Sequence, residues 1–424
     1  MTAQISNSAI SGANIAIIGG GPAGLMAAGR AAELGAAVTL IEKNSTPGRK
    51  LLLTGGGRCN VTSSSSLKQF VAAFGDNGNF LYRALAAFSP AELIKFLKSR
   101  GVPTRTDPDG KIFPSNDRAS SVLAALKSFA AGSGVKILHN SAAAELLCGD
   151  AVVIGVKLAN GDVISAQKVI VATGGLSYPE TGSTGDGYAF ARQCGHTIAP
   201  LKPGLIPLES DEWFVSKLQG LALKNISITI MADGKKTLSA NGDLIFTHFG
   251  LSGPQILVLS AAAVDALEQN RRVDVSLNLT PGLTAEQFQA ELQSYFARNG
   301  AKLFSSYLKE TLPKSLAVVM AGRCALQHTR KCAGITAGER AKIARLFCDF
   351  RMHITKPRGI GEATITRGGV SLSEIDPHTM QSRLVDGLYF CGEVLDLAGI
   401  TGGYNLQEAF STGWLAGESA AGSG

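Results

Sequence analysis

Short apolar runs separated by glycine clusters characterise the first fifty residues of the chain. Residues 15–18 read Ile-Ala-Ile-Ile, a run that is typical of a buried strand. The stretch GGGPAGLMAAGRAAELG follows and combines a tight turn with an alanine-rich helical pattern, and AVTLIEK then supplies a second apolar run. This order of strand, turn, helix and strand predicts an α/β fold.

The pattern changes twice further along the chain. After Gly195, short strand-like runs appear, namely ISITIMADG, LIFTHFG and RVDVSLNL. From Thr284 to about Asp349, segments such as AEQFQAELQSYFARNG and AGERAKIARLFCDF indicate helices. Strand-like sequence returns at GIGEATITRGGVSLSEID. We therefore expect a β-rich region and a helical region in the middle of the chain.

The composition is that of a globular protein with a large core. The chain has 424 residues, enough for two or three domains, of which 45% are hydrophobic and 17% charged. Its 40 basic and 33 acidic residues give a formal net charge of +7. This excess is compatible with an anionic partner and equally with an ordinary basic surface.

Several classes of protein are disfavoured by the sequence. The apolar stretches are too short for a membrane span, and the N-terminal residues lack the basic start and apolar run of a signal peptide. The seven cysteines form no CxxC pair, which indicates reduced thiols and a cytoplasmic location. The six histidines show no metal-ligand spacing, so we expect no metal.

The first glycine cluster has the spacing of a dinucleotide-binding turn. Gly19, Gly21 and Gly24 form GxGxxG between the first strand and the first helix, where glycines permit a sharp bend and close approach of a pyrophosphate to the helix N-terminus. Glu42, at the end of the second strand, suits the adenosine ribose hydroxyls and disfavours a 2′-phosphate. The candidate cofactor-binding residues here are Gly19, Gly21, Pro22, Ala23, Gly24, Glu42 and Lys43.

This fingerprint alone does not distinguish FAD from NAD, but later segments favour FAD. Residues 168–195 contain an apolar strand that ends in Ala-Thr-Gly-Gly, and residues 387–417 contain a strand, a Gly-Glu pair, a Gly-Gly turn and a long helix. In flavoproteins such a C-terminal return brings a helix N-terminus to the flavin, where partial positive charge stabilises the anionic reduced form.

The glycine-rich loop TGGGRCN, residues 54–60, belongs to a set of motifs that together resemble one family. GRKLLLTGGGRCNVT, VATGGLSYPETGSTGDGY, LIFTHFGLSGPQIL and GLYFCGEVLDLAGITGGYNLQEAFSTGWLAG are similar to segments of the BaiN-type NAD(P)/FAD-dependent oxidoreductases, also labelled aminoacetone-oxidase-like FAD-binding flavoproteins. The resemblance runs over nearly the whole chain. It implies a Rossmann-like FAD-binding domain built from both chain ends, with an inserted β-barrel-like domain and a small helical domain.

The resemblance gives approximate domain boundaries. The FAD-binding domain is expected at residues 1–195 and 357–424. The β-rich domain is expected at 196–282 with about 350–368, and the helical domain at 283–349.

The resemblance also implies which residues surround the cofactor. Basic residues after Gly48 would lie near its phosphates or ribose, the three glycines of TGGGRCN would let the backbone pass the isoalloxazine, and Glu393 would hold the ribityl or pyrophosphate portion. Solvated surface remains the alternative for the basic residues, and a helix cap for Glu393. The residues so implied are Arg49, Lys50, Gly55, Gly56, Gly57, Arg58, Thr173, Gly174, Gly392, Glu393, Gly402, Gly403, Tyr404 and Asn405.

Two residues are candidates for catalysis. A thiol can donate the proton that accompanies hydride transfer to a conjugated double bond, and Cys59 stands beside Arg58, which we expect to lower its pKa. Filling of the loop by a small buried residue is the alternative role for Cys59. His248 follows an apolar strand and suits proton transfer or substrate binding, although a histidine there can also bond to local backbone. Ser252 lacks a GxSxG pattern, which excludes a hydrolase.

Three classes of function follow. The chain can be an FAD-dependent oxidoreductase of a small molecule, including an amine or aminoketone oxidase, or an enzyme that reduces uridine in ribosomal RNA, an activity found in the family. It can also be a non-catalytic FAD-binding protein. Basic segments at 325–332 and 351–359 could track RNA phosphates or be ordinary surface. Because only one dinucleotide fingerprint is present, either NAD(P)H docks transiently beside the flavin as electron donor or another reductant serves.

Overall fold

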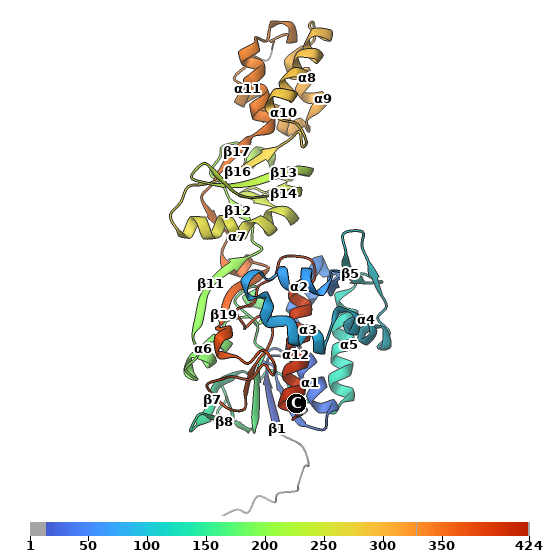
Figure 1. Ribbon diagram of the computed structural model, residues 1–424, viewed down its shortest axis with the longest axis vertical. Helices are drawn as coiled ribbons and strands as arrows, with labels where there is room; N and C mark the ends of the chain where they lie inside the picture. Colours follow the sequence, from blue (N-terminus) through green and yellow to red (C-terminus); the bar gives the residue numbers. More distant parts are fainter. Residues whose placement is uncertain (1–13, 328, 423–424) are drawn as a thin grey trace, which may run out of the picture. The chain divides into compact units, whose positions relative to one another are not determined.

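The computed structural model describes residues 14–327 and 329–422. Within them the chain divides into two compact units, which are described separately here (Figure 1). Unit 1 combines the residues up to 202 with those from 364 onward, and unit 2 comprises residues 203–363. Both ends of the described chain therefore enter the same unit.

A five-stranded parallel sheet forms the centre of unit 1, in the order β20-β10-β1-β2-β6. β1 lies in the middle, and its Ile15 and Ile17 side chains are fully buried. Burial of one such side chain contributes roughly 1.5–3 kcal/mol, which explains why the apolar runs of the sequence become central strands. The strands are β1 (Asn14–Ile18), β2 (Ala37–Ile41), β6 (Lys136–Leu138), β10 (Lys168–Val171) and β20 (Leu388–Phe390).

Helices from opposite ends of the sequence pack together in unit 1. α1 (Pro22–Glu33) begins with a proline at its first position, where the missing N–H costs no hydrogen bond. It packs against α12 (Tyr404–Ala420) and α5 (Ala119–Gly132), and Figure 1 shows the blue α1 beside the red α12. The other helices of unit 1 are α2 (Leu67–Ala72), α3 (Tyr82–Ala87), α4 (Pro90–Ser99) and α6 (Asp186–Gln193).

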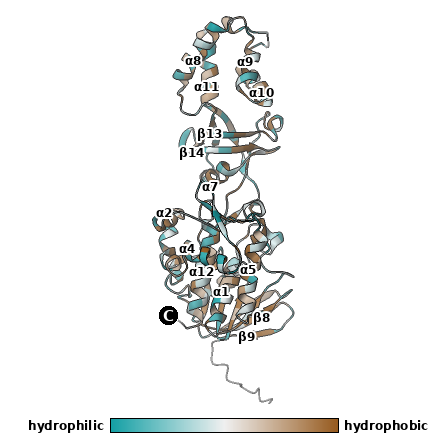
Figure 2. Ribbon diagram, turned by 90° about the vertical axis from the view of Figure 1, so that its right-hand side faces the viewer, coloured by the Kyte–Doolittle hydropathy of each residue, from teal (hydrophilic) through white to brown (hydrophobic). Residues whose placement is uncertain are grey.

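Three smaller sheets complete unit 1. One has the order β3-β5-β4, another the order β7-β8-β9, and β11 pairs with β19. β8 and β9 are largely brown in Figure 2, and Ile154 and Val163 on these strands are 56% and 54% exposed. The bounds are β3 (Thr62–Ser63), β4 (Thr104–Thr106), β5 (Lys111–Pro114), β7 (Ala143–Gly149), β8 (Val152–Leu158), β9 (Val163–Ser165), β11 (Ile198–Gly204) and β19 (Ile365–Val370).

Unit 2 consists of a seven-stranded sheet and five helices around a core of its own. Side-chain caps fix the starts of α8 and α11, where Thr284 and Thr336 each form a reciprocal capping box. The strands in sheet order are β17 (Phe350–Ile354), β16 (Val273–Asn278), β13 (Ala222–Ala232), β14 (Lys235–Phe246), β15 (Gly250–Ser252), β12 (Leu208–Glu209) and β18 (Lys356–Pro357). The helices are α7 (Pro254–Glu268), α8 (Ala285–Arg298), α9 (Phe304–Thr311), α10 (Lys314–Cys324) and α11 (Ala337–Cys348).

The expected barrel is only partly matched by the sheet of unit 2. Its hydrogen-bonded order begins at β17 and ends at β18, and these two strands are consecutive in the chain. No ladder joins them among the described residues, so closure into a barrel stays a prediction. The boundaries expected at residues 195, 282, 349 and 357 also stay predictions.

The described residues contain neither a candidate membrane span nor a cluster of metal-ligating side chains. None of the helices within 14–327 and 329–422 is long and apolar enough to cross a membrane. In the same residues, no group of three or more His, Cys, Asp or Glu side chains is arranged to hold a metal ion.

Candidate functional site

The turn between β1 and α1 has the geometry that the GxGxxG spacing predicts. A side chain at Gly24 would collide with the carbonyl oxygen of Gly19, so only glycine permits this close packing of helix on turn. At Gly21, by contrast, no atom of the described residues lies within 4 Å of the position that a side chain would take. Gly21 is the N-cap and has no side chain to cap α1, so the first backbone N–H groups of this helix lack partners within it, as at an anion site.

Glu42 connects this turn to the end of β2. Its side chain is buried, with 5% exposure, and Oε2 accepts a hydrogen bond of 2.9 Å from the N–H of Gly20. Oε1 accepts from the backbone N–H and the Nδ2 of Asn44, at 2.7 and 2.8 Å. Because each carboxylate oxygen has two acceptor sites, Glu42 can hold the turn and still accept a ligand hydroxyl.

The C-terminal segment returns to the same turn. A side chain at Gly392 would lie 2.8 Å from Cβ of Ala23, and one at Gly413 would collide with the carbonyl oxygen of Ala23. At the start of α12, Gly403 packs so closely on the carbonyl group of Thr62 that a side chain there would also collide. The middle of α12 thus packs beside the glycine turn, and its N-terminus packs on the residues after TGGGRCN, all within unit 1.

The loop TGGGRCN has an unusual backbone. Gly55, Gly56 and Gly57, at the end of a 3₁₀ segment (Lys50–Gly57), have φ angles of 58°, 66° and 87°. Cys59 also has a positive φ, 63°, and its N–H donates to the carbonyl oxygen of Thr54 at 2.9 Å. Only glycine adopts this region freely, so the cysteine carries a strain of about 1 kcal/mol or more.

The structure corrects the expected acidity of Cys59. Burial raises the pKa of its thiol to about 12, and a hydrogen bond with Thr54 offsets only part of that rise. The guanidinium of Arg58 lies 4.3 Å from the ring centre of Phe113, and the residue is exposed. The expectation that Arg58 lowers the pKa of Cys59 was therefore wrong, because desolvation dominates. Cys59 remains a protonated thiol at neutral pH.

An ion pair joins the two sequence segments that were expected near the cofactor. Nζ of Lys50 lies 2.6 Å from Oε2 of Glu393, and both side chains are about four-fifths buried. Ser177 donates to Oε1 of Glu393 at 3.0 Å, and the N–H of Thr366 donates to the same oxygen at 2.8 Å. Glu393 does not cap the last helix, whose N-cap is Gly403. The alternative of a helix cap is thus removed.

The other expected cations have protein partners. Lys43 donates to Oδ2 of Asp186 at 2.7 Å, at the start of α6. Nη1 of Arg49 donates to Oδ1 of Asn44 at 2.8 Å, and the residue is exposed. Arg58 stacks on Phe113, as described above. These three side chains lie around the turn region and use at least part of their donor capacity within the protein.

Side chains at the start of α12 are also engaged. The hydroxyl group of Tyr404 lies 2.8 Å from Oγ of Ser65. Asn405 closes a turn by accepting from the N–H of Gly399 and donating to its carbonyl oxygen, at 2.8 and 2.9 Å. Gly402 is buried with a φ of 132°. It is therefore backbone N–H groups, rather than these side chains, that this helix can offer a ligand.

Three buried oxygens in this region have no hydrogen-bond partner among the described residues: Asn60 Oδ1, Thr62 Oγ1 and Thr173 Oγ1. Thr62 contacts Gly403, and Cα of Thr173 would lie 3.1 Å from a side chain at Gly19. Gly174 follows with a φ of 73°. Because buried polar atoms are normally satisfied, these oxygens fit a site whose ligand supplies donors. The residues present thus fit a dinucleotide with a polar, extended middle part.

Glu408 is a feature that the sequence reasoning missed. It lies one turn into α12 with 2% exposure. Burial raises its pKa to about 8, with a smaller contribution from the charge of Glu393. Oγ1 of Thr412 lies 3.2 Å from its Oε1 and accepts from the N–H of Gly392 at 3.0 Å. Its position among small and apolar residues of a helix was the sequence signal that could have indicated a buried glutamate. That signal was insufficient, because burial depends on tertiary packing.

His248 lies in unit 2 and is exposed, in the connection between β14 and β15. Its ring centre is 5.0 Å from that of Phe249, in an edge-on arrangement. Cys59 belongs to unit 1. The two candidate catalytic residues are thus carried by different units.

A serine–histidine–glutamate arrangement in unit 1 is structural. Nδ1 of His196 lies 3.2 Å from Oε2 of Glu374, and Nε2 lies 2.9 Å from Oγ of Ser382. Oγ of Ser382 also accepts from the N–H groups of Leu384 and Val385, at 3.0 and 2.9 Å, and the serine is buried. A hydroxyl held in this way is not available as a nucleophile, in keeping with the absence of a hydrolase motif.

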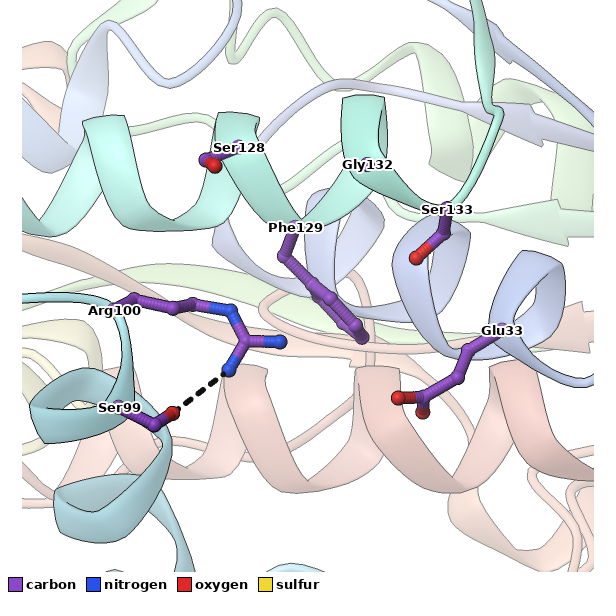
Figure 3. Close-up of a pocket in the computed structure, with 7 residues that line it drawn as sticks. All are labelled: Glu33, Ser99, Arg100, Ser128, Phe129, Gly132 and Ser133. Atoms are coloured by element: carbon purple, nitrogen blue, oxygen red, sulfur yellow. Dashed lines mark hydrogen bonds between the residues drawn. The ribbon is translucent and has the colours of Figure 1, made fainter.

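A pocket of about 460 Å³ lies elsewhere on unit 1, at the C-terminal ends of α1, α4 and α5 (Figure 3). Arg100 reaches across it and lies 4.6 Å from the ring centre of Phe129. The partial negative charge of three helix C-termini disfavours an anion here. The guanidinium of Arg100 already supplies the cation that these helix ends favour. None of the expected site residues lines it. The lining residues are Glu33, Ser99, Arg100, Ser128, Phe129, Gly132 and Ser133.

The family assignment follows from comparison with known proteins. The model of the HI0933-like protein Rossmann domain matches residues 13–419, nearly the whole chain. The chain belongs to the HI0933-like family. This confirms the resemblance that the motifs indicated. A 3-dehydro-bile acid delta(4,6)-reductase of the BaiN type and two ribosomal RNA dihydrouridine synthases also match over similar lengths.

Two curated relatives of this HI0933-like protein have different activities in their names. A 3-dehydro-bile acid delta(4,6)-reductase of Clostridium scindens is 31% identical over 96% of this chain and 98% of its own. A ribosomal RNA dihydrouridine synthase of Escherichia coli is 32% identical over 94% of this chain and 95% of its own. The two names thus refer to unlike molecules, a bile acid and ribosomal RNA.

The fold also matches solved structures. A 3-ketosteroid delta1-dehydrogenase from Sterolibacterium denitrificans superposes with a TM-score of 0.55, at 12% identity, covering 97% of this chain and all of that one. At this identity the likeness concerns the fold alone. Together with the family match, it confirms the expected Rossmann-like FAD-binding fold built from both chain ends.

Proposed function

We propose that this HI0933-like protein is an FAD-dependent oxidoreductase that reduces a carbon–carbon double bond conjugated to a carbonyl group. The observation that carries the proposal is the way α12 links three parts of unit 1: the glycine turn beside its middle, its own N-terminus, and the residues after TGGGRCN on which that N-terminus packs. A single dinucleotide that spans from the turn to α12 would use all three. FAD has the required two parts, a nucleotide and a flavin joined by a diphosphate.

Each part of the site has a role in this proposal. The first turn of α1 binds the diphosphate, and Glu42 accepts from the ribose of the adenosine. The ion pair of Lys50 and Glu393 fixes the segment beside the ribityl chain. The N-terminus of α12 would hold the pyrimidine end of FAD through its partial positive charge. Bound FAD would supply the chemistry of hydride transfer from NADH or NADPH to the substrate.

A proton donor is needed beside the hydride. We assign this role to Cys59, because it lies two residues beyond the glycine loop and its buried thiol is protonated at neutral pH. Its complete burial means that the glycine loop must open or shift for the sulfur to contact a substrate. The three left-handed glycines give the loop that freedom.

The substrate class follows from chemistry that the names of the two relatives share. A delta(4,6)-reductase acting on a 3-dehydro bile acid and a dihydrouridine synthase both saturate a double bond conjugated to a carbonyl. This common step favours a reductase over an amine or aminoketone oxidase and over a non-catalytic FAD-binding protein. A uridine of ribosomal RNA is thus one candidate substrate, and a small enone is another.

The basic segments of unit 2 favour the small molecule. Their arginines form ion pairs that reduce the charge available to RNA phosphates. Residue 328, within the first segment, lies outside the described residues. The pairs are Arg330 with Glu339, Arg351 with Asp349, and Arg358 with Glu209 and Glu362.

The test has three steps. Purified protein should be yellow and should release FAD on denaturation. Under anaerobic conditions NADH or NADPH should bleach the flavin, and a 3-oxo-4-ene steroid or unmodified ribosomal RNA should restore its absorbance, with the saturated product identified by mass spectrometry. A protein that takes up no flavin would contradict the proposal. A flavoprotein that only dioxygen reoxidises would be an oxidase and not the proposed reductase.

A further inference from the structure

Two cysteines far apart in the sequence lie side by side in unit 1. Cys148 is near the end of β7, and Cys194 directly follows α6. Their sulfur atoms are 3.5 Å apart. A pair of hydrogen bonds fixes this contact from one side, because the side-chain amide of Gln193 accepts from the N–H of Leu146 at 3.2 Å and donates to its carbonyl oxygen at 2.9 Å.

The surroundings of the two sulfur atoms differ. Cys148 is exposed, whereas Cys194 is half-buried. Burial, with a smaller contribution from the neighbouring thiol of Cys148, raises the pKa of Cys194 to about 12. An oxidant from solvent therefore meets Cys148 first, and a second thiol is already in place to resolve the product.

We propose that Cys148 and Cys194 form a reversible disulfide when the protein meets hydrogen peroxide. The sulfur of Cys148 attacks one oxygen of the peroxide, the O–O bond breaks, and the proton of the thiol leaves with the other oxygen as water, so that Cys148 becomes a sulfenic acid. The sulfur of Cys194 then attacks that sulfenic acid, an S–S bond forms, the S–O bond breaks, and the proton of Cys194 leaves with the hydroxyl group as a second water. Two thiols are oxidised by two electrons in total, and one hydrogen peroxide is reduced to two waters.

The bond would join two parts of the α/β unit. It closes a segment in which the two cysteines are 46 positions apart and attaches the β7-β8-β9 sheet to the end of α6. The opposite end of α6 holds Lys43 through Asp186. Oxidation thus restrains a helix whose other end borders the glycine turn, without requiring any change in the site itself.

A peptide map of the intact protein tests the proposal. The full-length protein, with whatever cofactor it retains, is reduced, freed of reductant, treated with one equivalent of hydrogen peroxide and alkylated. Before alkylation we expect the mass to fall by that of two hydrogen atoms. After alkylation and digestion we expect a peptide that links Cys148 to Cys194 and that dithiothreitol separates. The apparent melting temperature should rise on oxidation by a few degrees.

Substitution of single cysteines tests the same disulfide. Cys148→Ser and Cys194→Ser should each lose the linked peptide and the thermal shift, whereas Cys348→Ser, which removes a half-buried thiol of unit 2, should keep both. The wild-type map alone decides the outcome if a variant does not fold. Conversion of Cys148 to a sulfinic acid, or its linkage to a second chain while Cys194 stays alkylated, would overturn the proposal.

Discussion

At the scale of single residues, Glu408 couples the stability of unit 1 to pH. Its pKa is about 8 in the folded chain, whereas the ordinary value for glutamate is 4.5. Between these values the folded state keeps a proton that the unfolded state has lost. The free energy of unfolding therefore falls as pH rises through this window, by about 1.4 kcal/mol for each pH unit, and becomes constant above about pH 8.

Replacement of Glu408 by glutamine should remove that loss. We expect Glu408→Gln to match the wild type near pH 5 and to be more stable by several kcal/mol at pH 8.5, as measured by urea unfolding. Trp414, in the same helix, can report the transition in a Trp213→Phe background. Glu418→Gln is the control, since Glu418 accepts from Arg30 at 2.8 Å and should not gain stability at high pH. Equal pH dependence in Glu408→Gln and wild type would contradict the assignment.

Cys59 tests the chemical step at the same scale. If its thiol supplies the proton, Cys59→Ala should slow reoxidation of the reduced flavin by substrate roughly 10²- to 10⁴-fold while leaving its reduction by NAD(P)H unchanged. Stopped-flow absorbance separates the two half-reactions. Cys391→Ala removes another fully buried thiol and should leave both rates near wild type. Unaltered reoxidation in Cys59→Ala would reduce the residue to a packing role.

At the scale of elements, the contact between α1 and α12 depends on glycines. A methyl group on Gly413 would collide with the carbonyl oxygen of Ala23. Gly413→Ala should therefore cost roughly 1–3 kcal/mol and lower FAD retention, because the helices must move apart beside the glycine turn. Gly132→Ala is the matched control. Gly132 ends α5, and an added methyl group there would have no atom of the described residues within 4 Å, apart from its own helix and neighbours. This substitution should therefore be neutral or slightly stabilising. Equal stability of both variants, measured by thermal unfolding, would argue against this packing.

The same elements show what a sequence can and cannot predict. The strand, glycine turn and Glu42 are close in sequence, so their spacing predicted the turn and the fold. The pair of Lys50 and Glu393 joins positions 343 residues apart, and no local pattern indicates which partner a lysine will find. The predicted direction of the pKa shift of Cys59 was wrong for a related reason. Its neighbour Arg58 is visible in the sequence, whereas the burial of the thiol is not.

At the scale of the whole molecule, unit 1 is interrupted by unit 2 rather than followed by it. β20 and α12 come from the last residues, yet β20 pairs with β10 and α12 packs on α1. Residues 1–202 alone would lack one edge of the sheet and one covering helix. Unit 2, in contrast, is a continuous segment with its own hydrophobic core.

The two crossing points between the units lie close together within unit 1. The N–H of Ser371 donates to the carbonyl oxygen of Thr197, and Gly368 packs on the carbonyl group of Pro200. The two strands thus run antiparallel, since a later residue on one lies beside an earlier residue on the other. Continuing this register indicates that residues 202 and 364 are neighbours. A turn of a few residues can join such strand ends.

A shortened protein tests this organisation. We expect residues 1–202, joined by a short Gly-Ser turn to residues 364–424, to fold and to bind FAD without unit 2. Circular dichroism, a cooperative thermal transition and the flavin spectrum measure the outcome. The same fusion without residues 404–420 is the control and should neither fold nor hold flavin, because it lacks α12. If the fusion that retains α12 is also unfolded and colourless, the dinucleotide site depends on more than the residues of unit 1, and the assignment of every binding residue to that unit fails.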